Sequence, residues 1–150
     1  MPGNRAALPH PHAHGYEPLP TDPPRVVDAT YMDPSLDWAA GEMISTTRDL
    51  TRFVTALLDG RLTSRESLAE MRRTTDAGPL FRYGLGLQEF TVPCADGPQP
   101  VWGHTGQLIG YLTVALADGE DTSMVLSLNP YEQDPPVEAV LAMAVSVFCR

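Results

Sequence analysis

The spacing of apolar residues changes from helical to strand-like near Tyr83, and this change constrains the fold more than any other feature of the sequence. Upstream of it, Thr46 begins a helix whose apolar residues fall on one face, and Gly60 follows where a left-handed cap is expected. Ser64 is placed to cap a second, shorter helix over residues 65–73. We predict that both helices are structural elements.

Downstream of the change, short apolar runs separated by turn residues predict strands. The predicted strands are residues 83–87, 101–108, 112–117 and 123–128, and the predicted closing helix is residues 137–148. The acidic, glycine-containing segment between the last two strands is a hairpin signal. Two helices, an antiparallel meander and a closing helix predict an α+β fold, with an antiparallel sheet flanked by helices.

The first 35 residues show neither the helical nor the strand-like spacing of apolar residues. Residues 1–35 are rich in proline and lack apolar periodicity, so we predict an irregular loop region there and a folded region over residues 36–150. His10, His12 and His14 suggest a metal site. No Cys or carboxylate is spaced to complete a ligand shell with them. We therefore predict loop histidines, with no metal and no other cofactor.

Charge and hydropathy exclude several partners. The chain has 19 acidic residues and 10 basic ones, all of them Arg, and its net charge is −9. This charge argues against nucleic acid and against adsorption to anionic membranes. No apolar run has the length of a membrane span. Residues 1–24 also lack the apolar core of a signal peptide, so this sequence by itself predicts no export.

Two cysteines, Cys94 and Cys149, bear on the same question. Their spacing does not resemble a metal pair, and it leaves free thiols and a disulfide equally open. A disulfide would close a long loop and contribute roughly 4 kcal/mol in the chain-entropy model. It would also indicate that the parent protein is exported.

The stretch Gly103-His104-Thr105-Gly106-Gln107 has the chemistry of a binding site. Its glycines leave the backbone open, so a peptide laid along the strand can pair with it. Thr105, Gly106 and Gln107 are the predicted substrate-binding residues: the Thr105 hydroxyl for a carboxylate, and the Gln107 N–H as half of an oxyanion hole. His104 is the predicted catalytic residue, supplying charge or proton transfer near pH 7. The alternative, a glycine-rich edge strand with an exposed histidine, stays open from these residues alone.

Several short stretches occur together in a characteristic order. They are Pro11-His12-Ala13-His14-Gly15-Tyr16, Ala40-Gly41-Glu42-Met43-Ile44-Ser45, Asp49-Leu50 with Phe53, Tyr83-Gly84-Leu85-Gly86-Leu87, Gly103-His104-Thr105-Gly106, Gly110-Tyr111 and Phe148-Cys149. In this order, from His12 to Cys149, the chain resembles the C-terminal portion of the serine D-alanyl-D-alanine carboxypeptidases, in the class C β-lactamase-like superfamily of penicillin-binding proteins. The resemblance implies a β-lactamase/transpeptidase-like fold whose N-terminal half is missing.

The chemistry that this resemblance implies is acyl transfer. A Ser attacks a carbonyl, while the Lys of a Ser-x-x-Lys motif and the Tyr of a Tyr-x-Asn motif move protons. This sequence contains no lysine, and none of its five tyrosines is followed by Asn two residues on. We therefore expect a C-terminal fragment that supplies the His-Thr-Gly strand of a serine hydrolase and is inactive alone. The alternative is a non-catalytic module that completes a split hydrolase or binds peptidoglycan-like peptides.

The resemblance also implies partners and a location. It implies a Cys94–Cys149 disulfide, a secreted parent protein, and a peptide, β-lactam or ester-like substrate, with the missing N-terminal half as a second partner. Carboxypeptidases of this kind carry a basic residue after the Tyr-Gly-Leu-Gly-Leu stretch, where this chain has Gln88 and Glu89. Arg82 either replaces that residue or is an ordinary surface arginine. Esterase, amidase and β-lactamase activities of the parent thus remain open, as do its physiological substrate and its oligomeric state.

Overall fold

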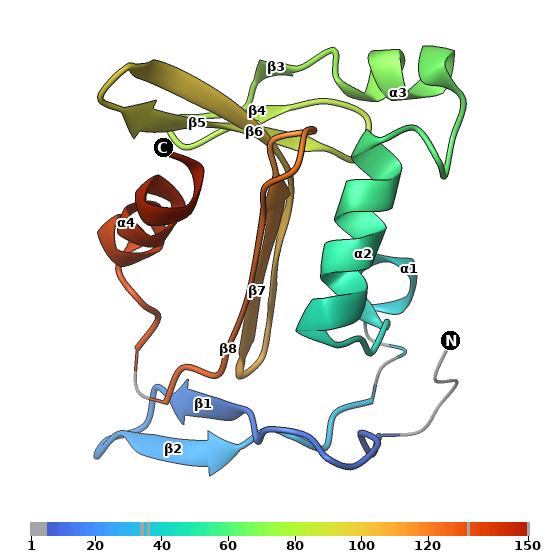
Figure 1. The fold of residues 1–150 in the computed structure, drawn as a ribbon. Helices are drawn as coiled ribbons and strands as arrows, with labels where there is room; N and C mark the ends of the chain where they lie inside the picture. The colour runs from blue at the N-terminus through green and yellow to red at the C-terminus, as the bar shows by residue number, and fades with distance from the viewer. Residues whose placement is uncertain (1–5, 34, 36, 132, 150) are drawn as a thin grey trace. The chain divides into compact units, whose positions relative to one another are not determined.

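The computed structural model describes residues 6–33, 35, 37–131 and 133–149 of the chain (Figure 1). The helices are α1 (Trp38–Gly41), α2 (Thr47–Leu58), α3 (Arg65–Met71) and α4 (Val137–Phe148). The strands are β1 (Tyr16–Leu19), β2 (Arg25–Asp28), β3 (Thr75–Asp76), β4 (Arg82–Tyr83), β5 (Gln88–Cys94), β6 (Gly97–Leu108), β7 (Tyr111–Ala117) and β8 (Ser123–Leu128). β1 and β2 pair with each other, and β3 to β8 form a six-stranded sheet in chain order. The predicted α+β class and the antiparallel pairing are confirmed.

The residues divide into two compact units. Unit 1 consists of Met1–Thr46, Gly106–Thr113 and Ser127–Pro135, and unit 2 consists of Thr47–Thr105, Val114–Leu126 and Pro136–Arg150. Strands β6, β7 and β8 each contribute residues to both units. The predicted domain boundary at residue 35 stays a prediction. Within the described ranges, none of the helices has the length and apolar character needed to cross a bilayer.

Unit 2 has two apolar cores, and β6 contributes to both. The first core joins the sheet to α4 and consists of Val92, Val101, Val114, Leu116, Met124, Ala144 and Phe148. The second core joins the sheet to α2 and α3 and consists of Val54, Leu58, Leu68, Leu87 and Ala117. Val101 belongs to the first core and Trp102 packs against the second, because successive side chains of a strand point to opposite faces. Apolar burial on both faces holds the centre of β6 firmly in place.

The helix signals of the sequence are found where they are expected. α2 ends just before Gly60, whose φ of +72° is the left-handed conformation of a helix cap. The Ser64 hydroxyl accepts a hydrogen bond from the Ser67 N–H at 3.1 Å, which caps α3. At the other end of unit 2, Cys94 and Cys149 form a disulfide with a Cα–Cα distance of 5.2 Å. The predicted pairing is confirmed, and it ties the end of β5 to the end of α4.

The structure differs from the prediction in the segment before residue 35, which is predicted to be irregular. There β1 and β2 form an antiparallel hairpin, with Tyr16 opposite Asp28. β2 contains the β-branched pair Val26-Val27, which favours a strand. The hairpin also depends on a contact distant in sequence, since the Tyr111 hydroxyl donates to the Ala13 carbonyl at 3.0 Å. Proline content alone therefore misjudged this segment.

The strand predicted over residues 83–87 is also wrong in its extent. Only Tyr83 belongs to a strand, and the residues after it form a turn in which the Gly84 N–H donates to the Leu87 carbonyl at 2.8 Å. Gly86 has a φ of +69°, a conformation that interrupts a strand. The strand β5 begins only at Gln88, a start that the sequence does not signal.

The disulfide gives a first testable prediction. The two cysteines are 55 residues apart, and a cross-link of that span lowers the entropy of the unfolded chain. We expect the double substitution Cys94→Ser with Cys149→Ser to reduce the free energy of unfolding by roughly 4 kcal/mol. Urea denaturation of both proteins measures the difference. An unfolding midpoint that reductant leaves unchanged in the wild type would contradict a stabilising cross-link.

A pair of glycines on β6 gives a second prediction. A Cβ at Gly103 would collide with the backbone carbonyl oxygen of Ala115, whereas nothing lies within 4 Å of a Cβ at Gly106. We expect Gly103→Ala to cost about 1–3 kcal/mol, because β6 and its neighbour must move apart. Gly106→Ala, the matched control, should stay within about 0.5 kcal/mol of the wild type. Equal thermal unfolding of the two variants would refute the close approach.

The β1–β2 hairpin gives a third prediction, on pH. Hydrogen bonds from the side chain and backbone of Thr30, and then from His14, lower the pKa of Asp28 from 3.8 to about 2. A lowered carboxyl pKa stabilises the folded state above pH 4, and this contribution disappears as the pH falls from about 4 to about 2. Asp28→Asn should remove that part of the pH dependence of the unfolding midpoint. Identical slopes for both proteins between pH 2 and pH 4 would count against it.

Candidate functional site

The predicted site residues, 103–107, lie in the second half of β6, where this strand extends past the end of its neighbour β5. β5 pairs with β6 from Cys94 opposite Gly97 to Gln88 opposite Gly103, and β5 has no residue beyond Gln88. β6 continues from Gly103 to Leu108. His104 and Thr105 belong to unit 2, and Gly106 and Gln107 belong to unit 1. The structure thus keeps all four predicted site residues on one strand, past the end of the β5 ladder.

Thr105 is held by the side chain of Gln88. The Gln88 amide oxygen accepts hydrogen bonds from the Thr105 backbone N–H at 2.7 Å and from its hydroxyl at 3.0 Å. Gln88 is only 4% exposed, so the accepting oxygen belongs to a buried side chain. The side chain of Gln88 therefore extends the ladder by one step where β5 has ended.

His104 is an exposed residue with both ring nitrogens engaged. Its Nδ1 lies 2.5 Å from the Thr105 carbonyl oxygen, and its Nε2 lies 2.8 Å from the Tyr83 hydroxyl. A carbonyl oxygen only accepts, so Nδ1 carries the proton, and Nε2 of the neutral ring then accepts from Tyr83. The two rings meet edge to face, with centroids 5.6 Å apart. The predicted catalytic role of His104 stays a prediction, and it requires one of these two bonds to open.

Gly106 and Gln107 lie in unit 1. Gly106 is exposed, and nothing lies within 4 Å of a Cβ placed on it, so there is free space beside the strand at this residue. The Gln107 side chain donates to a carboxylate oxygen of Asp134 at 2.8 Å. The proposed oxyanion role belongs to the Gln107 backbone N–H, which this side-chain bond leaves unaffected. The substrate-binding roles of both residues stay predictions.

Arg82 contacts Thr74 and Glu89. Its guanidinium donates to the Thr74 hydroxyl at 3.0 Å and to the Thr74 carbonyl at 2.8 Å, and it lies 3.6 Å from the Glu89 carboxylate. These contacts link β4 to the segment before β3 and to β5. They give Arg82 a structural role, consistent with an ordinary surface arginine. Its charge is already paired with the carboxylate of Glu89.

The N-terminal histidines stack rather than converge. The ring centroids of His10 and His12 are 4.6 Å apart, and those of His12 and His14 are 5.7 Å apart. Nδ1 of His12 lies 3.1 Å from the Pro9 carbonyl oxygen, and Nδ1 of His14 lies 2.7 Å from Asp28. These hydrogen bonds give the two histidines a structural role in the segment that leads into β1.

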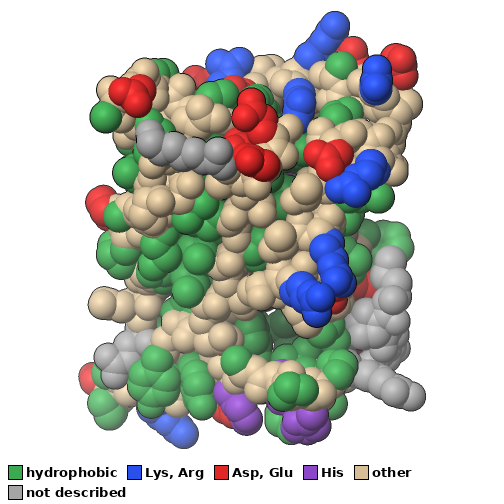
Figure 2. Space-filling view, in the orientation of Figure 1, with side chains coloured by type: hydrophobic (Ala, Val, Ile, Leu, Met, Phe, Trp, Pro, Cys, Tyr) green, Lys and Arg blue, Asp and Glu red, His purple; other side chains and the backbone are tan. Residues whose placement is uncertain are grey.

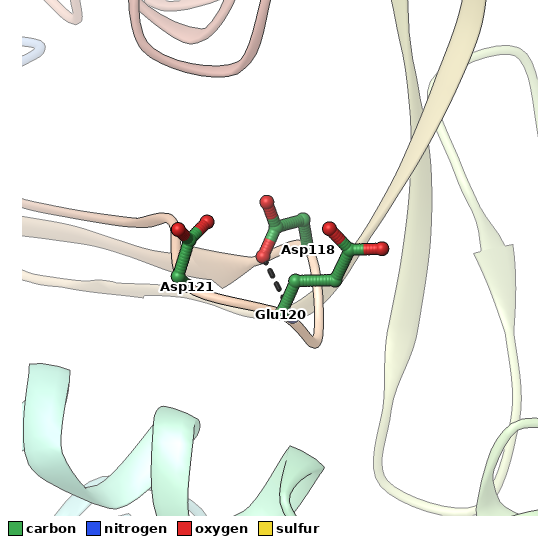
Figure 3. Close-up of side chains that lie close together, drawn as sticks. All are labelled: Asp118, Glu120 and Asp121. Carbon is green, nitrogen blue, oxygen red and sulfur yellow. Dashed lines mark hydrogen bonds between the residues drawn. The ribbon is translucent and has the colours of Figure 1, made fainter.

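A carboxylate cluster lies in the β7–β8 hairpin. Figure 3 shows Asp118, Glu120 and Asp121 together, and one ligand atom from each lies within 4.8 Å of the others. The Asp118 carboxylate accepts from the Glu120 N–H at 2.8 Å and from the Thr122 N–H at 3.1 Å. These bonds shape the turn. They give the Asp118 carboxylate a structural role in the hairpin.

Sequence reasoning missed two residues of this site, Gln88 and Tyr83. In the sequence, Gln88 directly follows the stretch Tyr83-Gly84-Leu85-Gly86-Leu87, and Tyr83 is the first residue of that stretch. Their contacts to Thr105 and His104 span 17 and 21 residues of sequence. The sequence has no local signal for either role, because each depends on contacts with β6.

Comparison with known proteins agrees with this geometry. The Beta-lactamase family model matches residues 3–146. A D-stereospecific amidohydrolase from Streptomyces sp. is 34% identical with a TM-score of 0.82, over 96% of this chain and 42% of that chain. A D-amino acid amidase from Ochrobactrum anthropi SV3 is 30% identical with a TM-score of 0.62, over 79% of this chain and 34% of its own. The chain therefore spans less than half the length of these structures. It belongs to the β-lactamase-like serine hydrolase family.

Proposed function

We propose that this chain supplies the substrate-binding strand of a serine hydrolase whose attacking Ser comes from residues outside this sequence. One observation carries the proposal. β6 presents His104 and Thr105 beyond the end of the β5 ladder, while the sequence has no lysine and so no Ser-x-x-Lys pair. Residues 104–107 of β6 would form one wall of an acyl-transfer site, which we call the substrate wall. The nucleophile of that site is not in this sequence.

The reaction that fits this wall is hydrolysis of an amide or a related acyl compound. The Ser oxygen bonds to the substrate carbonyl, the amine leaves with a proton, and water then releases the acyl group from the Ser. Thr105, Gly106 and Gln107 would contact the substrate, with the Gln107 N–H stabilising the oxyanion. His104 would exchange a proton or hold charge nearby. The similar proteins are named as an amidohydrolase and an amidase, and these names support an amide as the substrate of the complete hydrolase.

Two surfaces of the chain support a polypeptide partner. β8 is the last strand of the sheet, and no described strand pairs with its outer edge. On α4, Val137, Leu141 and Met143 are 51%, 40% and 42% exposed, and apolar side chains gather over this helix in Figure 2. An edge strand and an apolar helix face are surfaces that another chain segment can cover. We assign that role to the polypeptide that carries the Ser-x-x-Lys motif.

The disulfide supports an extracytoplasmic parent protein. Disulfides persist in oxidising compartments and are rare in the cytosol. Cys94 and Cys149 form such a bond here. We propose on this basis that the complete hydrolase works outside the cytoplasm.

Reconstitution tests the proposed function. The chain is mixed with a separate polypeptide that carries the Ser-x-x-Lys part of a β-lactamase-like serine hydrolase, and a fluorescent fluorophosphonate labels reactive serines. We expect labelling of that Ser only when both polypeptides are present, because neither holds the whole site. Labelling of this chain alone would overturn the proposal. An unlabelled mixture that still binds peptidoglycan-like peptides would favour the non-catalytic module instead.

Substitutions of this chain in the same mixture then test whether His104 takes part in the reaction. His104→Ala should slow labelling by about 100-fold if its imidazole takes part in proton transfer. His12→Ala is the matched control, because it removes another imidazole, one whose Nδ1 lies 3.1 Å from the nearby Pro9 carbonyl oxygen. Equal labelling rates for the two variants would exclude His104 from the chemistry.

A further inference from the structure

The hydrogen bonds of Gln88 fix the direction of the Thr105 hydroxyl. A backbone N–H can only donate, so the Gln88 atom that lies 2.7 Å from the Thr105 nitrogen must be the amide oxygen. That oxygen has a second lone pair, and the Thr105 hydroxyl lies 3.0 Å from it. The hydroxyl must donate there, since two oxygens at this distance need a shared proton. The only proton of the Thr105 hydroxyl is therefore committed to Gln88.

The Thr105 hydroxyl oxygen can therefore accept a hydrogen bond from a ligand but has no proton left to donate to one. An ionised carboxylate accepts hydrogen bonds and cannot donate them, so it has no favourable contact with this oxygen. A protonated amino group carries donors only and fits it. Gln88 is 4% exposed, and a Thr105 hydroxyl that turned toward a carboxylate would give up one of the two bonds to its buried oxygen.

Two other polar side chains of unit 2, His104 and Arg82, are also hydrogen-bonded to protein groups. In the neutral form of His104, the Nδ1–H donates a hydrogen bond to the Thr105 carbonyl, and Nε2 accepts one from the Tyr83 hydroxyl. Arg82 is bonded to Thr74 and paired with Glu89. Neutral His104 thus has no free donor for a carboxylate, and the charge of Arg82 is already paired with the Glu89 carboxylate.

We propose that Gln88 is a positioning residue that makes the Thr105 hydroxyl an acceptor, so that this wall selects substrates with a free, protonated amino group over substrates with a terminal carboxylate. The inference rests on the proposed function, and it names the substrate class: amides of amino acids, or peptides bound through their amino end. It departs from the expectation that Thr105 binds a carboxylate.

Ligand titrations of the 150-residue chain by two-dimensional ¹H–¹⁵N NMR test this inference. D-phenylalanine amide carries an ammonium group without a carboxylate, and N-acetyl-D-phenylalanine carries a carboxylate without an ammonium, on the same benzyl scaffold. The backbone amides of His104 and Thr105 report binding. We expect the wild type to bind the ammonium ligand about tenfold more tightly, because a charge-assisted hydrogen bond distinguishes the two. Equal affinities, a preference for the carboxylate, or no response to either ligand would overturn the inference.

Variants of Gln88 separate positioning from simple structural support. Gln88→Glu retains a carboxylate oxygen that accepts from both Thr105 groups, so the ammonium preference should persist. Gln88→Met removes the acceptor and frees the hydroxyl proton, so the ratio of the two affinities should fall to about one. Gln99→Met is the matched control: it makes the same change on β6 opposite Val92 and should leave the ratio unchanged. A Gln88→Met variant with the wild-type ratio would refute the positioning role.

The outcomes also separate this inference from the proposed function. Serine labelling in the reconstituted mixture together with equal ligand affinities would reject the inference and keep the function. An ammonium preference that depends on Gln88, without any labelling, would do the reverse.

Discussion

The end of the β5–β6 ladder is the constraint on which the site depends. β5 stops at Gln88, opposite Gly103, while β6 continues to Leu108. Backbone groups past that point would lose their partner on this edge, and an unpaired buried donor is costly. The Gln88 side chain takes over at Thr105. The free edge that can receive a substrate therefore begins directly after a residue that is tightly held.

Packing explains why that edge is well defined. Just before it, Val101 is fully buried in the first core and Trp102 packs against the second. Gly103 then allows a close approach to the Ala115 carbonyl, where any side chain would collide. Two cores and a backbone contact thus fix β6 within the three residues that precede His104. A site built on such an element keeps its geometry better than one built on a loop.

The sequence predicted the elements whose signals are local. Apolar spacing and cap residues located α2, α3, β7, β8 and α4, because those helices and strands are determined by residues close in the chain. The β1–β2 hairpin and the turn after Tyr83 were mispredicted, since proline counts and glycine alternation do not reveal tertiary contacts. The disulfide followed from resemblance and not from spacing. At the site, the motif identified the strand but not Gln88 or Tyr83, whose roles depend on pairing with β6.

The direction of one hydroxyl and the charge of the whole chain favour the same ligand. Thr105 presents an acceptor, and the chain carries a net charge of −9 without a single lysine. A negative field repels a substrate carboxylate and raises the local concentration of a cationic amine. Glu89 adds to the negative charge and pairs with Arg82, while its neighbour Gln88 orients the hydroxyl. These two adjacent residues thus supply a negative charge and an oriented acceptor, and both suit an ammonium group.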